Sequence, residues 1–113
     1  VKKERFNLRK SNNKCRSING YLLELDDGGE LKYLSKVLQR KEAMYYRVYT
    51  GGNDVIEEGK FFYINSGKPL LQGHWTTNTP DDTYHRENCV EIFPWLTTIN
   101  DVPCLHNFHF ICE

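Results

Sequence analysis

The sequence predicts an α+β domain in which two helices precede several short strands and a long irregular loop. Helical periodicity of apolar residues occurs twice within the first 40 residues. From residue 45 onward, short runs rich in aromatic and β-branched residues alternate with turn residues, which is typical of strands. Residues 68–88 carry neither pattern and are polar, and a loop of this length in a small domain is usually functional.

Length and composition exclude several classes of protein. The 113 residues are enough for one domain with one core, so we assign residues 1–113 to a single domain. Lys and Arg number 15, as do Asp and Glu, so no net charge attracts nucleic acid or an anionic membrane. No apolar run approaches the roughly 20 residues that span a membrane, which argues against membrane insertion. No nucleophile motif is present, so we predict that the protein is not an enzyme.

The first helix is predicted over residues 4–18. Leu8, Cys15 and Ile18 share one helical face, and Gly20 marks the end of the pattern. A second helix is predicted from Asp27, which resembles an N-cap, to about residue 40. Its apolar face holds Leu31, Leu34, Val37 and Leu38.

Short apolar runs predict the strands. They occupy residues 21–25, 45–49, 61–64, 90–92 and 107–111. Residues 51–54 (Gly-Gly-Asn-Asp) are predicted to break the second of these strands, and residues 65–67 to form a turn.

The chain contains four cysteines and no Cys-x-x-Cys motif of the kind used for zinc or redox chemistry. Four cysteines in a short chain indicate disulfides and a secreted, extracellular protein. The count alone leaves three pairings open.

Motifs in a fixed order then connect the chain to a known family. They are Tyr49-Thr50-Gly51-Gly52, Glu58-Gly59-Lys60-Phe61, Ser66-Gly67-Lys68-Pro69-Leu70, Trp75, Glu87-Asn88-Cys89, Asn100-Asp101, Cys104 and Phe110-Ile111-Cys112-Glu113. With these motifs, nearly the whole chain resembles a C-type lectin domain, especially the secreted lectins of insects. The resemblance implies a C-type lectin-like fold with two helices flanking small antiparallel sheets. It also implies the disulfides Cys15–Cys112 and Cys89–Cys104. The family's first strand is missing, so the domain is predicted to be clipped at its N-terminus.

The resemblance implies a primary calcium site that also binds carbohydrate. Its ligands would be Thr79, Asp81, Glu87, Asn100 and Asp101. Calcium prefers about 6–8 oxygen ligands, and this set keeps the three carboxylates of the family's sites. Two departures stand out. The family's Glu-Pro-Asn or Gln-Pro-Asp reads Thr79-Pro80-Asp81, and its Trp-Asn-Asp reads Ile99-Asn100-Asp101. The shorter Thr79 side chain predicts weaker calcium binding.

A second acidic group matches the family's auxiliary calcium site. It comprises Asp54, Glu58, Asp82 and Asn88, together with Glu87. The alternative interpretation is a solvated acidic loop.

The predicted partners are glycans or glycoproteins, with oligomers supplying avidity. Asp81 can only accept hydrogen bonds when ionised, which favours galactose-type sugars, and Tyr84 could stack on the apolar face of the sugar. The competing hypothesis is a calcium-independent domain of the same fold that binds a protein partner.

Overall fold

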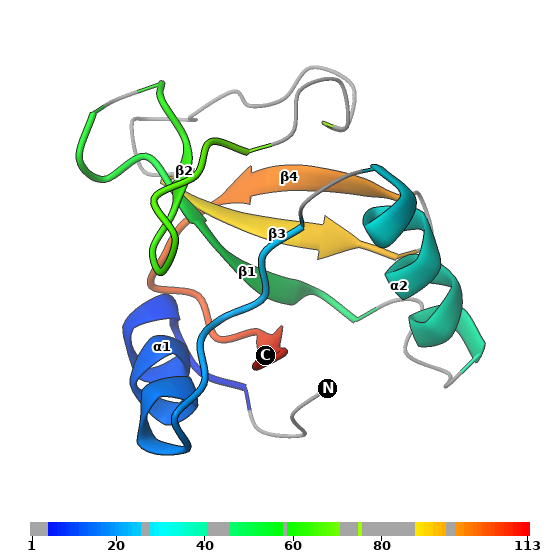
Figure 1. Cartoon of the computed structure of the whole chain (residues 1–113), viewed down its shortest axis with the longest axis horizontal. Coiled ribbons are helices and arrows are strands. Elements are labelled where there is room, and N and C mark those ends of the chain that lie inside the picture. Colours follow the sequence, from blue (N-terminus) through cyan, green and yellow to red (C-terminus); the bar gives the residue numbers. More distant parts are fainter. Residues whose placement is uncertain are drawn as a thin grey trace.

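The structure is a computed structural model that describes residues 5–25, 28–40, 46–57, 59–70, 75, 88–94 and 97–113. These residues form two helices and five strands, which confirms the predicted α+β class (Figure 1). The elements are α1 (Leu8–Ser17), α2 (Gly28–Arg40), β1 (Val48–Asn53), β2 (Phe62–Tyr63), β3 (Cys89–Phe93), β4 (Thr98–Val102) and β5 (His109–Phe110).

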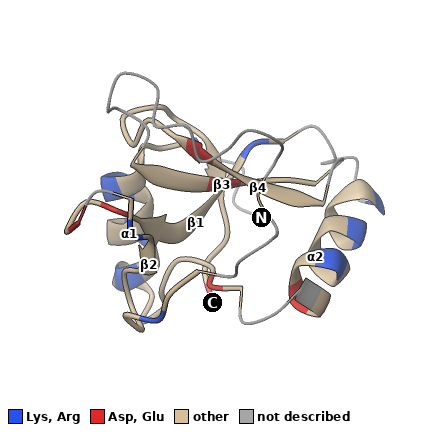
Figure 2. Ribbon diagram, turned by 90° about the horizontal axis from the view of Figure 1, so that it is seen from above, with Lys and Arg blue, Asp and Glu red and all other residues tan. Residues whose placement is uncertain are grey.

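The strands form one sheet in the order β2-β1-β3-β4, whose neighbours are antiparallel, and β5 pairs with β1 in parallel. The two helices lie at opposite ends of this sheet (Figure 1). Figure 2 shows Lys and Arg residues, in blue, along both helices.

Helix α1 is shorter than the predicted range 4–18. It begins after Asn7, whose side-chain oxygen accepts a hydrogen bond from the backbone N–H of Lys10 at 2.9 Å and so caps the helix. Cys15 is buried as expected, but the prediction for Ile18 was wrong, because this residue lies past the last turn and is 54% exposed. Helix α2 ends at the predicted residue, and its Leu31 and Leu38 are buried. The proposed cap, Asp27, lies outside the described residues.

The predicted break at residues 51–54 was wrong, because β1 continues through Asn53. The glycines serve close packing instead of a turn. A side chain at Gly52 would place its Cβ 2.9 Å from a methyl group of Leu70. Glycine therefore lets Leu70 cover the strand.

Strand β4 was not predicted from the sequence. Its five residues pair with β3 in continuous register as a hairpin, so pairing with the preceding strand creates β4 in a stretch with polar residues at its centre. Conversely, the strand predicted over residues 21–25 is reduced to one bridge between Leu22 and Cys112. Phe6 makes a single antiparallel bridge with Phe108. The clipping of the family's first strand remains a prediction.

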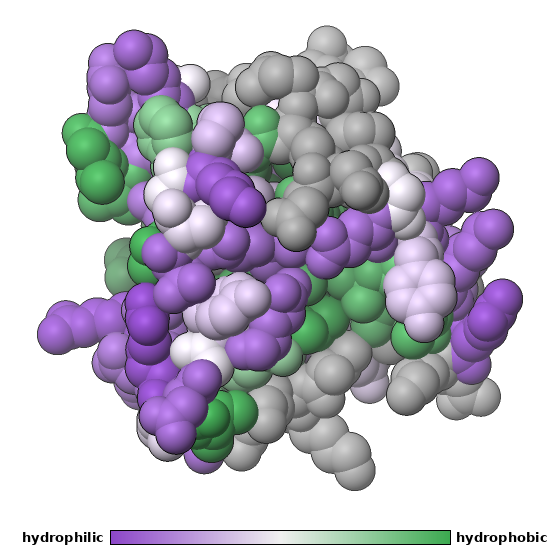
Figure 3. Space-filling model, viewed as in Figure 1, coloured by the Kyte–Doolittle hydropathy of each residue, from purple (hydrophilic) through white to green (hydrophobic). Residues whose placement is uncertain are grey.

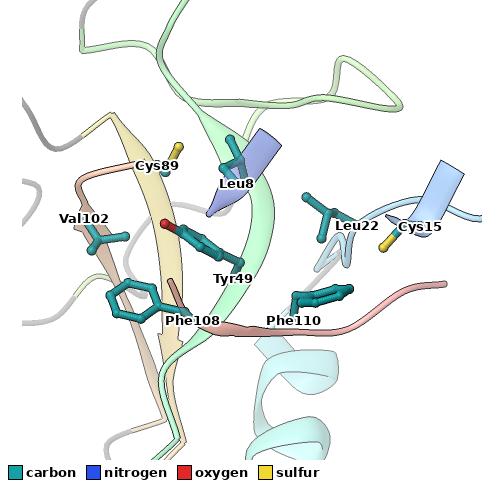
Figure 4. Packing of buried hydrophobic residues seen from close by; sticks show 8 residues of the cluster. All are labelled: Leu8, Cys15, Leu22, Tyr49, Cys89, Val102, Phe108 and Phe110. Carbon is teal, nitrogen blue, oxygen red and sulfur yellow. The ribbon is translucent and has the colours of Figure 1, made fainter. Parts of the chain in front are cut away.

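Two hydrophobic clusters occupy opposite faces of the sheet. The first contains Tyr49, Phe108 and Phe110, and Figure 4 shows these rings beside Leu8 and Leu22. The second is covered by α2 and by the half-buried Trp75. Its buried members are Leu23, Leu25, Leu31, Tyr63, Leu70, Val90, Ile92 and Ile99.

The disulfides Cys15–Cys112 and Cys89–Cys104 are present, with Cα–Cα distances of 5.4 and 5.2 Å, which confirms the predicted pairing. The first links α1 to the C-terminal segment, and the second links β3 to the segment after β4.

Hydrophobic residues on the surface are scattered, and Figure 3 shows them as separate green areas within a mainly hydrophilic face. Among the described residues, no helix has the length and apolar character needed to cross a membrane.

Candidate functional site

Strand β4 carries Asn100 and Asp101, two of the predicted primary ligands. It is the last strand in the order of the sheet, and Trp75 adds one bridge to it at Ile99. Consecutive strand residues point to opposite faces. Asn100 accordingly lies opposite Glu91, whereas Asp101 lies opposite Val90 and is fully buried.

The Asn100 side chain is held by an ion pair whose carboxylate is buried. Its Nδ2 donates a hydrogen bond to Glu91 Oε2 at 3.1 Å. Arg47 donates to both oxygens of the same carboxylate, from Nε to Oε1 at 2.7 Å and from Nη2 to Oε2 at 2.5 Å. Glu91 is fully buried, while the Arg47 side chain is 43% exposed. Burial of an unpaired carboxylate is costly, and pairing with Arg47 offsets that cost for Glu91 in the middle of β3.

Two predicted auxiliary ligands meet where β1 ends and β3 begins. The backbone N–H of Asp54 donates to the carbonyl oxygen of Asn88 at 3.0 Å. Asp54 is only 2% exposed, and its Oδ2 accepts a hydrogen bond from the backbone N–H of Gly59 at 2.9 Å. Asn88 Oδ1 is buried and has no hydrogen-bond partner among the described residues. Such an oxygen is expensive to bury unless a donor or a cation satisfies it.

Tyr49 fixes the segment that follows β4. Its hydroxyl lies within hydrogen-bonding distance of the carbonyl oxygens of Pro103, Cys104 and His106, the shortest distance being 2.7 Å, to His106. Burial raises the pKa of the Tyr49 phenol, the negative charge of Glu91 raises it further, and Arg47 lowers it. The Tyr49 contacts and the Cys89–Cys104 disulfide together hold the end of β4 against the start of β3, beside Asn88.

The other predicted site residues lie outside the described residues. They are Glu58, Thr79, Asp81, Asp82, Tyr84 and Glu87. Within the part of the chain that the structure describes, no three His, Cys, Asp or Glu side chains gather in a group that could hold a metal ion. The described residues therefore bring together Asp54 with Asn88, and place Asn100 beside Asp101 on β4.

The family model for the C-type lectin domain matches residues 4–113, almost the whole chain. The chain belongs to the C-type lectin domain family. Members of this family bind carbohydrate and are not enzymes, in agreement with the sequence prediction.

Among similar proteins, C-type lectin 37Db of Drosophila melanogaster is 32% identical over 107 residues, covering 91% of this chain and 67% of the relative. Human Collectin-10 is 27% identical, and the match covers 100% of this chain but only 40% of the relative. This C-type lectin domain also superposes on the carbohydrate-recognition domain of the mouse scavenger receptor C-type lectin, with a TM-score of 0.84 and 19% identity, covering 97% and 83% of the two chains. The lectin CEL-I from Cucumaria echinata gives 0.86 at 15% identity, with 98% and 84% covered.

Two residues of this C-type lectin domain that hold a predicted ligand were missed from the sequence. Glu91 contacts Asn100 directly, and Arg47 contacts Glu91. A signal was available, because Glu91 stands between Val90 and Ile92 in a run predicted to be a strand. A carboxylate in the centre of a strand, flanked by buried apolar residues, implies a basic or hydrogen-bonding side chain that pairs with it. The identity of that partner depends on the long-range pairing of β1 with β3, which the sequence alone does not specify.

Proposed function

We propose that this domain is a secreted lectin that binds carbohydrate in a calcium-dependent manner, with a preference for galactose-type sugars. The observation that carries the proposal is the buried Asn88 Oδ1, which has no hydrogen-bond partner among the described residues, in a residue whose backbone bonds to Asp54. Both positions were assigned to the auxiliary calcium site from the sequence. The chemistry fits, since both side chains offer the hard oxygen atoms that calcium prefers.

In the proposed primary site, Asn100 and Asp101 would act with Thr79, Asp81 and Glu87. When bound, calcium would supply a positive centre that polarises the hydroxyl groups of a sugar. The chain's own residues would orient those hydroxyls. Ionised carboxylates can only accept hydrogen bonds, whereas an asparagine amide has two N–H groups to donate. One Asn100 N–H is used on Glu91, so the second would be available to a sugar hydroxyl.

The departure at Ile99 does not weaken the proposal. Ile99 is 3% exposed and packs in the second hydrophobic cluster with Val90 and Ile92, so it fills space in the core. The isoleucine therefore acts through packing, and its presence in place of tryptophan removes no oxygen ligand. The competing hypothesis, a calcium-independent domain that binds a protein, then depends on the departure at Thr79.

Relatives support the carbohydrate ligand. The carbohydrate-recognition domain of cow CD23, 24% identical with a TM-score of 0.80, was crystallised in the presence of a GlcNAc2Man3 oligosaccharide. The mouse scavenger receptor C-type lectin and the lectin CEL-I from Cucumaria echinata, which have the same fold, support the same class of ligand. Two disulfides, with no free cysteine in the chain, favour an oxidising extracellular location. Single sites of this kind are weak, so assembly would supply avidity, as in the trimeric structure of Clec4f.

Retention on immobilised sugars tests the proposal. Wild-type protein should be retained on galactose or mannose columns in calcium and released by EDTA. Asp101→Asn should abolish retention, because it removes one carboxylate with little change of shape. Glu24→Gln is the matched control, since this buried carboxylate accepts a hydrogen bond from the backbone of Ser66, far along the chain from the proposed ligands. Retention that persists unchanged in EDTA would overturn calcium dependence.

The sugar preference needs a separate comparison. Galactose columns should retain the protein more strongly than mannose columns, because Asp81 only accepts hydrogen bonds. Thr79→Gln should strengthen galactose retention, since glutamine adds reach to the calcium ligand and an amide donor. Stronger retention on mannose would contradict the preference and leave calcium-dependent binding intact.

A further inference from the structure

A continuous row of side chains crosses one face of the sheet and ends at Asn100. Arg47 precedes β1, Glu91 lies on β3 and Asn100 lies on β4, so each contact joins neighbouring strands. The guanidinium of Arg47 also lies 4.4 Å from the centre of the Phe108 ring, just before β5. Both Arg47 and Glu91 are therefore restrained by more than one contact.

The row determines which end of the Asn100 amide faces Glu91. An ionised carboxylate has no hydrogen to donate, so only the nitrogen of the amide can bind it. Glu91 cannot rotate away easily, because Arg47 occupies both of its oxygens in a two-pronged contact. With the nitrogen held, the amide oxygen of Asn100 is directed away from Glu91.

We infer that Glu91 and Arg47 are positioning residues for the calcium site, which orient the Asn100 amide so that its oxygen faces the cation. This inference rests on the proposed function. Glu91 would not itself be a ligand, since it is fully buried and both its oxygens accept hydrogen bonds from Arg47. The positive charge of Arg47 balances the negative charge of Glu91, so the pair adds no net charge to the site.

Glu91→Gln tests the inference by adding a donor where there was only an acceptor. The amide introduced by this substitution can keep one acceptor for Arg47 and turn its nitrogen toward Asn100. The Asn100 amide would then invert, and its own nitrogen would face the cation. Calcium affinity, measured by calorimetry, should fall about tenfold or more, as is usual when a residue that orients a metal ligand is lost. The matched Glu24→Gln control should bind calcium like the wild type.

The double variant Glu91→Gln/Asn100→Asp separates orientation from general damage. It restores the hydrogen bond with reversed polarity, because the new amide on β3 donates to a carboxylate on β4 that still has an oxygen for the cation. Calcium affinity should return at least to the wild-type value. If the double variant binds as weakly as Glu91→Gln, or if Glu91→Gln binds like the wild type, the positioning role is wrong.

The wild type alone provides an independent measurement. In NMR spectra, one Asn100 side-chain N–H should have the shifted, slowly exchanging signal of a hydrogen bond to a carboxylate, and calcium should leave that bond intact. Loss of this signal on calcium addition would overturn the inference even if Glu91→Gln does not fold. A wild type that binds no calcium overturns the proposed function, whereas calcium binding with equal affinity in Glu91→Gln overturns the positioning role alone.

Discussion

Arg47→Met should destabilise the fold because it leaves the buried Glu91 carboxylate without its cation. Removing one partner of a fully buried ion pair costs about 3–5 kcal/mol. Two features lower the expected cost here. The Arg47 side chain is 43% exposed, so water screens part of the interaction, and Asn100 still donates to Glu91. We therefore expect a loss of about 2–3 kcal/mol in the free energy of unfolding.

Urea unfolding of four proteins measures this interaction as a double-mutant cycle. The proteins are the wild type, Arg47→Met, Glu91→Gln and the double variant. In the variant that combines Arg47→Met with Glu91→Gln, no buried charge is left unpaired, so the two losses of stability should not add. We expect a coupling free energy of about 1–3 kcal/mol between the two sites. A coupling below about 0.5 kcal/mol would refute the claim that Arg47 stabilises the charge of Glu91.

Three further outcomes follow from described contacts. Folding raises the pKa of the Tyr49 phenol, so the wild type should lose stability as the pH rises above the pKa of tyrosine in the unfolded chain, about 10. Tyr49→Phe should reduce this loss, which urea midpoints at about pH 8 and about pH 11 measure. Gly20→Ala should cost about 1–3 kcal/mol in urea unfolding, since the new Cβ would lie 2.6 Å from the carbonyl oxygen of Glu113. Replacing Cys89 and Cys104 by alanine should lower the unfolding free energy by about 3 kcal/mol, as expected for a loop that spans 15 residues.

Local patterns predicted the helices better than the sheet. Apolar periodicity located α2 well, because a helix depends on contacts within a few residues. Strand β4 was missed, since Asn100 and Asp101 interrupt any apolar pattern and the strand exists only through its pairing with β3. The glycines of β1 were misread as a turn for a related reason, because the close approach of Leu70 is a tertiary contact.

The candidate site shows the same division. Family motifs pointed to Asp54, Asn88, Asn100 and Asp101, because such motifs place oxygen-bearing residue types at fixed positions along the sequence. The residues that hold a ligand were not visible in this way. Arg47 and Glu91 are 44 residues apart, and only the pairing of β1 with β3 brings them together. Both disulfides were predicted correctly, but through the family resemblance, since four cysteines leave three pairings open.

Thermal unfolding in calcium and in EDTA tests most directly whether this domain is a calcium-dependent lectin. Binding to the folded state alone should add about 1.4 kcal/mol of stability when free calcium is tenfold above its Kd. That gain corresponds to a rise of about 5 °C in Tm for a domain of this size. The rise should vanish in Asp101→Asn and shrink as the pH falls toward about 4, where the ligand carboxylates become protonated. Equal Tm values for the wild type in millimolar calcium and in EDTA would contradict calcium binding and favour a calcium-independent domain that binds a protein partner.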